Sequence, residues 1–418
     1  MYESTLKSMH MKNINGKDEY DTKCRFIIQL GKAAHAYGSP AIRLESYLKR
    51  LSQAFEIKGE FQSTPTDMIF AFQRDEEDWQ KIHVTSAAGG LDLTKLPRLD
   101  DLVNEVIAGD VSISDADTRL KEIDKSPDPY GNVILAIGYA AVGAGIAGVF
   151  SGSWTDILFS TLISLVVFAM VWQAGRKGGW VADWLPLSSA FVAGLLAVTI
   201  KHAVPELNYV LVTVAGIIVL VPGFSVSIGV AELVNNHVVS GLTNLTNGLV
   251  YLFKQFLGAW LAFSIVIALG PLPSATSTAI DPSWNWACVP AMFIGLVLVF
   301  QTSPRYLLWA LISCSLGYGG VLLGSALMGS NLGNLLGALA VGVFANVWEW
   351  KSGRPGSIVL LPAITTLVSG SIGLRGLVAS AQGDAAGSGQ FMEMFLIAAT
   401  LTAGLLIANT LVKPKKTL

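Results

Sequence analysis

The chain has 418 residues, of which 52% are apolar and only 14% are charged. The charges are unevenly distributed: residues 1–131 carry 39 of them with a net charge of −5, whereas residues 132–418 carry 19 with a net charge of +3. The second part is therefore too poor in charge for a soluble domain and is typical of a membrane protein. The overall net charge of −2 gives no indication of a nucleic-acid partner.

Residues 1–131 are predicted to form a small α+β domain and a linker. No apolar stretch follows the basic residues near the N-terminus, so we expect no signal peptide and a cytoplasmic location. Ser114 and Asp117 fit a capping box at the start of the last helix. The pattern predicts helices at 24–37, 41–55, 99–108 and 115–123, and strands at 58–63, 68–73 and 81–85.

From residue 132 onward, about ten apolar segments approach the ~20 residues that a bilayer requires. A stretch rich in Pro, Ser and Thr at 271–285 divides them into a first half, 132–270, and a second half, 286–418. Each half has five segments, so the second must enter the membrane in the opposite orientation, as an inverted repeat. We thus predict a mostly α-helical membrane protein. Its segments are 132–150, 154–173, 184–202, 207–223, 246–269, 286–301, 305–327, 331–348, 356–373 and 391–412.

The basic residues between these segments predict the orientation. Eight of them fall in connections on the side of the head, and two fall on the other side. Because positive residues are retained on the inner side, both termini are expected in the cytoplasm and the 271–285 linker outside. The inner set is Arg176, Lys177, Arg305, Lys351, Arg354, Lys413, Lys415 and Lys416, and the outer set is Lys201 and Arg375.

The stretch 220–254 contains a predicted helix break. Pro222 removes a backbone donor and Gly223 lets the chain turn. Polar residues then recur at helical spacing and are predicted to share one helix face. A broken helix with such a stripe indicates a solute site within the membrane, although an amphipathic helix on the bilayer surface has the same pattern. The stripe is Glu232, Asn236, Ser240, Asn244, Asn247, Tyr251 and Lys254.

A second break is predicted at the corresponding place in the second half, at Val368-Ser369-Gly370. The N-termini of broken helices offer backbone donors to a solute carboxylate. A zwitterionic amino acid also needs a partner for its ammonium group and one for a side-chain hydroxyl. The predicted substrate-binding residues are Pro222, Gly223, Ser225, Ser227, Asn236, Asn244, Lys254, Gly370, Ser371 and Arg375.

Ionisable residues at membrane depth are the candidates for proton coupling. Asp156, at the start of the second segment, is either a proton or ammonium site or a carboxylate that the helix dipole favours. Glu232 and His237 are either a proton-carrying pair or part of an interfacial polar helix. Lys254 and Arg375 are the two cations that a dicarboxylate would require, and Arg375 also fits a helix cap.

Five short motifs follow one another along the chain: Gly38–Glu45, Thr64–Thr66, Ser151–Asp156, Val221–Gly223 and Gly370–Leu377. Their order and spacing, from about residue 24 to 412, resemble the threonine/serine exporter family. The resemblance implies a cytoplasmic head, ten spans in two halves, and export of threonine and serine driven by the proton motive force. Some relatives with separate halves are associated with succinate export. Ser369 stands where a second proline is usual, and Ser151 where glycine is expected.

The leading hypothesis is a secondary transporter in the cytoplasmic (inner) membrane that exports threonine or serine, with a dicarboxylate as the alternative solute. A membrane-embedded enzyme would need clustered Asp, His or Cys motifs, and the only histidines beyond residue 131 are His202 and His237. A sensor whose head binds a partner is a third hypothesis. No metal or cofactor is expected. The glycines at 143–148 match the dinucleotide-binding fingerprint by letter, but they lie inside an apolar segment with no strand before it. The expected partners are the solute, protons and the lipid bilayer; a homo-oligomer is left open.

Overall fold

The computed structural model describes residues 2–414 except 74–78, 86–91, 276, 368–369 and 382–385. The chain divides into two compact units. One unit, here called the head, is formed mainly by Met1–Asp128. The other, here called the membrane unit, comprises Pro129–Lys351 and Gly356–Pro414. The second break predicted at Val368-Ser369 lies outside the described residues.

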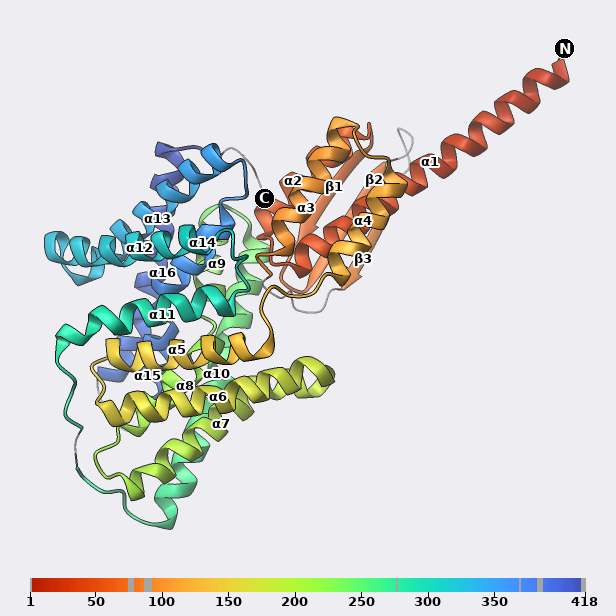
Figure 1. The fold of residues 1–418 in the computed structure, drawn as a ribbon. Helices are drawn as coiled ribbons and strands as arrows, with labels where there is room; N and C mark the ends of the chain where they lie inside the picture. Colours follow the sequence, from red (N-terminus) through yellow and green to blue (C-terminus); the bar gives the residue numbers. More distant parts are fainter. Residues whose placement is uncertain are drawn as a thin grey trace. The chain divides into compact units, whose positions relative to one another are not determined.

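The head contains a three-stranded antiparallel sheet, in the order β1-β2-β3, together with four helices (Figure 1). The three predicted strands are confirmed. The N-cap prediction is wrong: Ser112 caps the last helix by accepting from the backbone N–H of Asp115, because the same Ser-x-x-Asp spacing occurs two residues earlier. The elements are α1 (Tyr2–Ala36), α2 (Ala41–Ala54), β1 (Lys58–Ser63), β2 (Asp67–Gln73), β3 (Trp79–Thr85), α3 (Lys95–Ala108) and α4 (Ile113–Lys125).

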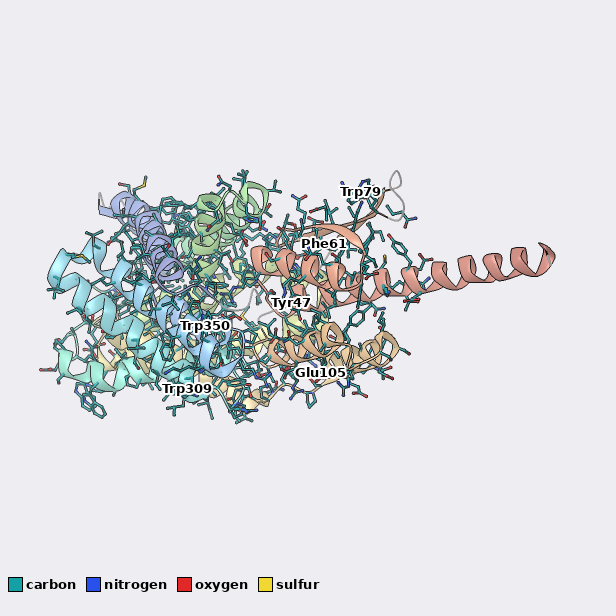
Figure 2. The ribbon with its side chains drawn as sticks, turned by 90° about the horizontal axis from the view of Figure 1, so that it is seen from above. Tyr47, Phe61, Trp79, Glu105, Trp309 and Trp350 are labelled. Carbon is teal, nitrogen blue, oxygen red and sulfur yellow. The ribbon has the colours of Figure 1, made fainter. Side chains whose placement is uncertain are left out.

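The head has its own apolar core. Alternate residues of β2 are buried, with Phe70 and Phe72 at 0% and 1% exposure, because successive strand residues point to opposite faces. Tyr47 of α2 is also buried, and the Phe61 ring of β1 contacts both phenylalanine rings edge-on (Figure 2). Trp79, at the start of β3, lies away from this core and is 52% exposed (Figure 2). The head therefore buries an apolar core of its own.

Nine helices in the described part of the membrane unit are long and apolar enough to cross a membrane, or ten if a bent pair forms one span. The chain is a multi-pass membrane protein, as its composition predicts. The helices are α5 (Asn132–Val149), α6 (Trp154–Lys177), α7 (Gly179–Ala203), α8 (Tyr209–Ile217), η1 (Ile218–Leu220), α9 (Gly223–Val234), α10 (Val238–Leu269), η2 (Pro282–Trp284), α11 (Asn285–Val299), α12 (Leu307–Met328), α13 (Ser330–Ser352), α14 (Ser357–Leu367), α15 (Gly370–Ala381) and α16 (Ala386–Leu411).

The predicted break at Pro222-Gly223 is confirmed. The α8–η1 segment ends at Leu220, and α9 continues from Gly223 at an angle of 58°. The prediction that one helix face extends from Glu232 to Lys254 is wrong. The helix ends at Val234, and Asn236 adopts a positive φ of 64° in a turn that leads into α10, a conformation that asparagine tolerates better than most residues.

Within each half, helices pack in pairs. In the first half α6 packs on α8, α7 on α10 and α9 on α10; in the second half α12 packs on α14 and α15 on α16. The α13 and α16 helices meet where Gly342 faces the Ala408 methyl group. Across the halves, α5 lies beside α11, and a Cβ at Gly138 would be 3.3 Å from the Gly295 carbonyl oxygen (Figure 1). Small residues let these backbones approach closely.

Candidate functional site

The first break lies against the α15 helix at a pair of glycines. A Cβ placed on Gly370, the first residue of α15, would lie 2.8 Å from the Cα of Gly223, the first residue of α9. Both glycines are buried, and Gly223 opens a helix of twelve residues. The first N–H groups of a helix have no partner within that helix. The contact therefore places the backbone donors at the start of α9 beside α15 in the membrane unit.

The helix break also leaves a carbonyl group without its usual partner. In a continuous helix the Leu220 carbonyl would accept from the N–H four residues later. Here the chain turns, and the Gly223 N–H donates to the Val221 carbonyl at 2.8 Å. The Leu220 carbonyl accepts instead from Nε2 of Gln255, at 3.0 Å. Gln255 lies on α10 and is fully buried.

The Gln255 side-chain oxygen, Oε1, is buried and has no hydrogen-bond partner among the residues that the structure describes. Because a carbonyl only accepts, the amide nitrogen must face Leu220, and the orientation of the amide is fixed by chemistry. The break therefore carries a buried acceptor of hydrogen bonds. Sequence analysis missed this residue and placed Lys254 in the stripe instead.

Glu232 is held where α9 packs against α10. The close contact between Gly229 and Gly241, where an added Cβ would lie 2.9 Å from the opposite carbonyl oxygen, brings the helices together. Oε2 of Glu232 then accepts from the hydroxyl of Ser240 and from Nδ2 of Asn244, both at 2.8 Å. Oε1 has no hydrogen-bond partner within the described part of the chain, although Glu232 is only 2% exposed. A buried carboxylate with one unengaged oxygen can accept a proton.

The other predicted polar residues of this region differ in their surroundings. Ser227 is buried, and its hydroxyl has no partner among the described residues. Ser225 is half-buried on the same helix, and Ser371 is buried at the start of α15. Asn236 and His237 belong to the turn between α9 and α10, where Asn236 is exposed and His237 half-buried.

Asp156 binds backbone groups with both of its oxygens. Oδ2 accepts from the Ser153 N–H in a capping box at the start of α6, and Oδ1 accepts from the Asn208 N–H, each at 2.8 Å. Lys201 donates to the Leu207 carbonyl at 3.0 Å. The Leu207 carbonyl and the Asn208 N–H belong to one peptide group, so a buried ammonium and a buried carboxylate hold it at both ends. These contacts favour the capping interpretation of Asp156.

The two cations expected near the solute lie apart from Glu232. Nζ of Lys254 donates to the Asp183 carbonyl of α7 at 3.1 Å. The Arg375 guanidinium lies over the Phe150 ring, 5.0 Å from its centre. No carboxylate in the described part of the chain forms a salt bridge with either residue. The structure thus brings Glu232, Ser240 and Asn244 together and leaves Lys254 and Arg375 outside that group.

Comparison with known proteins gives the family. A family model described as "Putative threonine/serine exporter" matches residues 25–266. An uncharacterized protein of Schizosaccharomyces pombe is 25% identical over 371 residues, which are 85% of this chain and 48% of the relative. Pheromone-regulated membrane protein 10 of Kluyveromyces lactis is 26% identical over 375 residues, which are 86% of this chain and 38% of the relative. The protein of the same name from Yarrowia lipolytica is 24% identical over 373 residues, which are 85% of this chain and 30% of the relative.

The chain spans less than half the length of these curated relatives. No solved structure matches it. The family match covers more than half of the chain and includes the head from residue 25, the first break and the α9–α10 contact around Glu232. By this match, the chain belongs to the threonine/serine exporter family.

Proposed function

We propose that the chain is a proton-coupled secondary transporter that exports a small zwitterionic solute, threonine or serine. The observation that carries this proposal is the helix break at Pro222-Gly223, where the N-terminus of α9 lies against Gly370 of α15. The N-terminus of a broken helix provides donors for a carboxylate at membrane depth. Family membership supports the same class of function.

The transport scaffold in this proposal is an inverted repeat of five plus five spans, with both termini cytoplasmic. The helix pairs within each half support it. So do two similar turns. The N–H groups of Ser151 and Gln301 each donate to the carbonyl three residues before, and both residues have positive φ, 59° and 53°. Gly152 and Thr302, which follow them, each donate to the carbonyl five residues before.

Glu232 is the proposed proton carrier. Its Oε2 is fixed by Ser240 and Asn244, so a proton would be taken up at Oε1, which has no hydrogen-bond partner in the described residues. His237, in the adjoining turn, is the proposed relay residue, and Asp156 is assigned to the capping of α6. A dicarboxylate is the weaker candidate solute because Lys254 and Arg375 lie apart from this group and contact Asp183 and Phe150.

Purified protein in proteoliposomes tests this function. Vesicles loaded with unlabelled threonine should accumulate labelled threonine and serine by counterflow, and an imposed pH gradient should accelerate net movement. Stronger competition by succinate than by either amino acid would replace the zwitterion with a dicarboxylate. If none of the three solutes moves, the chain is not a transporter of this class.

A labelling experiment tests the proposed orientation. Ser274 and Lys177 are both exposed and lie in connections expected on opposite sides. Each is replaced by cysteine after the three buried native cysteines are changed to alanine. An impermeant thiol reagent should label the cysteine at 274 from outside intact cells and reach the one at 177 only after lysis. The reverse pattern would invert the topology.

A further inference from the structure

The Gln255 side chain lies where the first broken helix turns, and the described residues satisfy only half of its amide. Nε2 donates to the Leu220 carbonyl, whereas Oε1 is buried without a hydrogen-bond partner among the residues described. Leaving a buried acceptor unpaired costs free energy, and native proteins seldom retain such groups without a reason. The side chain is fully buried, so bulk water does not solvate it in this conformation.

We propose that Gln255 Oε1 accepts a hydrogen bond from the transported solute and thereby selects a solute that carries a donor group. This inference rests on the proposed transport function and adds a specificity-determining residue to it. The donor is an N–H of an ammonium group or the O–H of a side-chain hydroxyl. A carboxylate has no proton to donate and would face the lone pairs of Oε1.

The arrangement of donors and acceptors around the break agrees with a zwitterion. The N-terminus of α9 supplies N–H donors, which suit the solute carboxylate. Gln255 supplies the complementary acceptor from α10, a helix that packs on both α9 and α15. A dicarboxylate would find donors for one end only. An amino acid finds a partner for each of its charged groups without a second cation.

Gln255 also occupies the buried face that leads to Glu232. It follows Asn244 by eleven residues, which is three helical turns, so the two residues share one face of α10. Asn244 is the residue that donates to Glu232. At 1.5 Å per residue the two positions are about 16 Å apart along the axis. The solute group and the proton group are therefore two distinct sites on one helix face.

Two substitutions separate solute binding from a merely structural role. Gln255→Met keeps the length of the side chain but removes both hydrogen-bonding groups. Gln255→Glu keeps an acceptor, and in its ionised form it loses the donor to Leu220. Lys254→Met, on the neighbouring residue that contacts Asp183, is the matched control. All variants are reconstituted as full-length protein and assayed by counterflow, with unlabelled threonine, alanine, the hydroxy acid analogue of threonine that lacks the ammonium, and succinate as competitors.

We expect Gln255→Met to weaken competition by threonine about tenfold to a hundredfold relative to succinate, the loss that follows removal of one hydrogen bond to a charged group. Gln255→Glu and Lys254→Met should retain the preference for threonine over succinate. If Gln255→Met weakens threonine and alanine equally but not the hydroxy acid analogue, the donor is the ammonium. If it weakens threonine and the analogue but not alanine, the donor is the hydroxyl.

The inference is overturned if the wild type transports and Gln255→Met retains its selectivity. It is also overturned if Met and Glu at this position lose the selectivity equally, because the amide would then serve only the Leu220 carbonyl. Size-exclusion profiles of the variants report folding, and if the Met variant does not fold, Gln255→Glu and Gln255→Asn decide the same question. Absence of counterflow by the wild type is a different result, which removes the proposed function and this inference with it.

Discussion

The α9–α10 pair and the α15–α16 pair are built alike but carry different chemistry. Each pair is joined by two glycines in close contact. A Cβ at Gly229 would lie 2.9 Å from the Gly241 carbonyl oxygen, and one at Gly376 would lie 2.7 Å from that of Gly387. The first pair buries Glu232 with two polar partners, whereas the second directs Arg375 onto the ring of Phe150.

The two pairs share the glycine crossing that joins their helices, and they differ in whether a carboxylate is buried there. Glycine at the crossing lets two helix backbones touch, and this requirement is the same in both pairs. A buried carboxylate costs desolvation energy and is retained only with partners, a condition that the first pair meets through Ser240 and Asn244. A shared scaffold can therefore place a titratable group in one half alone. Four predictions test this difference.

The largest effect is expected from Glu232→Gln. The amide cannot exchange a proton in the working pH range, so pH-gradient-driven transport should be abolished while solute exchange continues. Glu393→Gln on α16, a half-buried acid of the other pair, is the matched control and should leave both activities unchanged. Driven uptake and counterflow in proteoliposomes measure the two activities. Full driven transport by Glu232→Gln would remove the functional difference between the pairs.

The scaffold itself is tested by Gly229→Ala and Gly376→Ala. A Cβ at Gly229 would be 2.8 Å from the Leu245 nitrogen, and one at Gly376 would be 2.7 Å from the Phe391 nitrogen. Backbone atoms cannot rotate away, so each variant should lose about 1–3 kcal/mol of stability. Thermal unfolding in detergent measures the loss. Gly389→Ala on α16, where a Cβ meets nothing within 4 Å, should not destabilise the protein. Unequal losses at 229 and 376 would show that the two crossings are not equivalent.

A smaller effect is expected from Arg375→Gln. It removes a contact between a cation and an aromatic ring, worth about 0.5–2 kcal/mol. For a zwitterionic solute, threonine counterflow should fall less than in Gln255→Met, and the double variant with Lys254→Met should add little. Severe loss in both single variants, together with strong succinate competition, would assign the second pair a role in carboxylate binding.

The smallest effect is expected in the head. It separates a pH-dependent change in the head from the effect of Glu232 on the pH profile of transport. His35 is 7% exposed, and burial lowers its pKa below the ordinary value of 6.5, despite a contact with the Pro65 carbonyl. The unfolded chain therefore binds a proton at His35 more readily than the folded chain does. The contribution of neutral His35 to the free energy of unfolding is complete above about pH 6.5 and is lost as the pH falls toward the pKa of the folded state.

We expect hydrogen exchange in the α1–β2 region of the full-length protein to accelerate between pH 7 and pH 5, after correction for intrinsic rates. His35→Gln should reduce this acceleration and leave gradient-driven transport unchanged. A change in the pH profile of transport in His35→Gln would mean that the head, and not Glu232 alone, contributes to it.

Local patterns in the sequence predicted the elements and the break. Apolar length identified the membrane-crossing helices, and Pro222-Gly223 marked the break because both residues act on their own backbone. Alternation located the strands of the head. The turn at Asn236 was not predicted, since Asn and His are compatible with a helix and only the packing of α9 against α10 demands the reversal.

The side-chain partners were harder to predict. Glu232 could be singled out from the sequence because a carboxylate among apolar residues is conspicuous, and the structure buries it between α9 and α10. Its role as a proton carrier stays a prediction. Gln255 was not predicted, because the polar stripe was assigned to the adjacent charged residue Lys254. The eleven-residue spacing from Asn244 places Gln255 on the same helix face and could have indicated it. The Asp156 contact with Asn208 joins residues far apart in sequence, and no local pattern encodes it.

The peptide group between Leu207 and Asn208, held by Lys201 and Asp156, has an electrical consequence. Moving one elementary charge through a membrane potential of 100 mV involves about 2.3 kcal/mol. The ammonium belongs to α7 and the carboxylate to α6, and because their charges are opposite, the voltage does almost no net work on a displacement that they share. The anchoring of the first broken helix is thus insensitive to voltage. Any voltage dependence of transport then reports the proton and the solute and not this anchor.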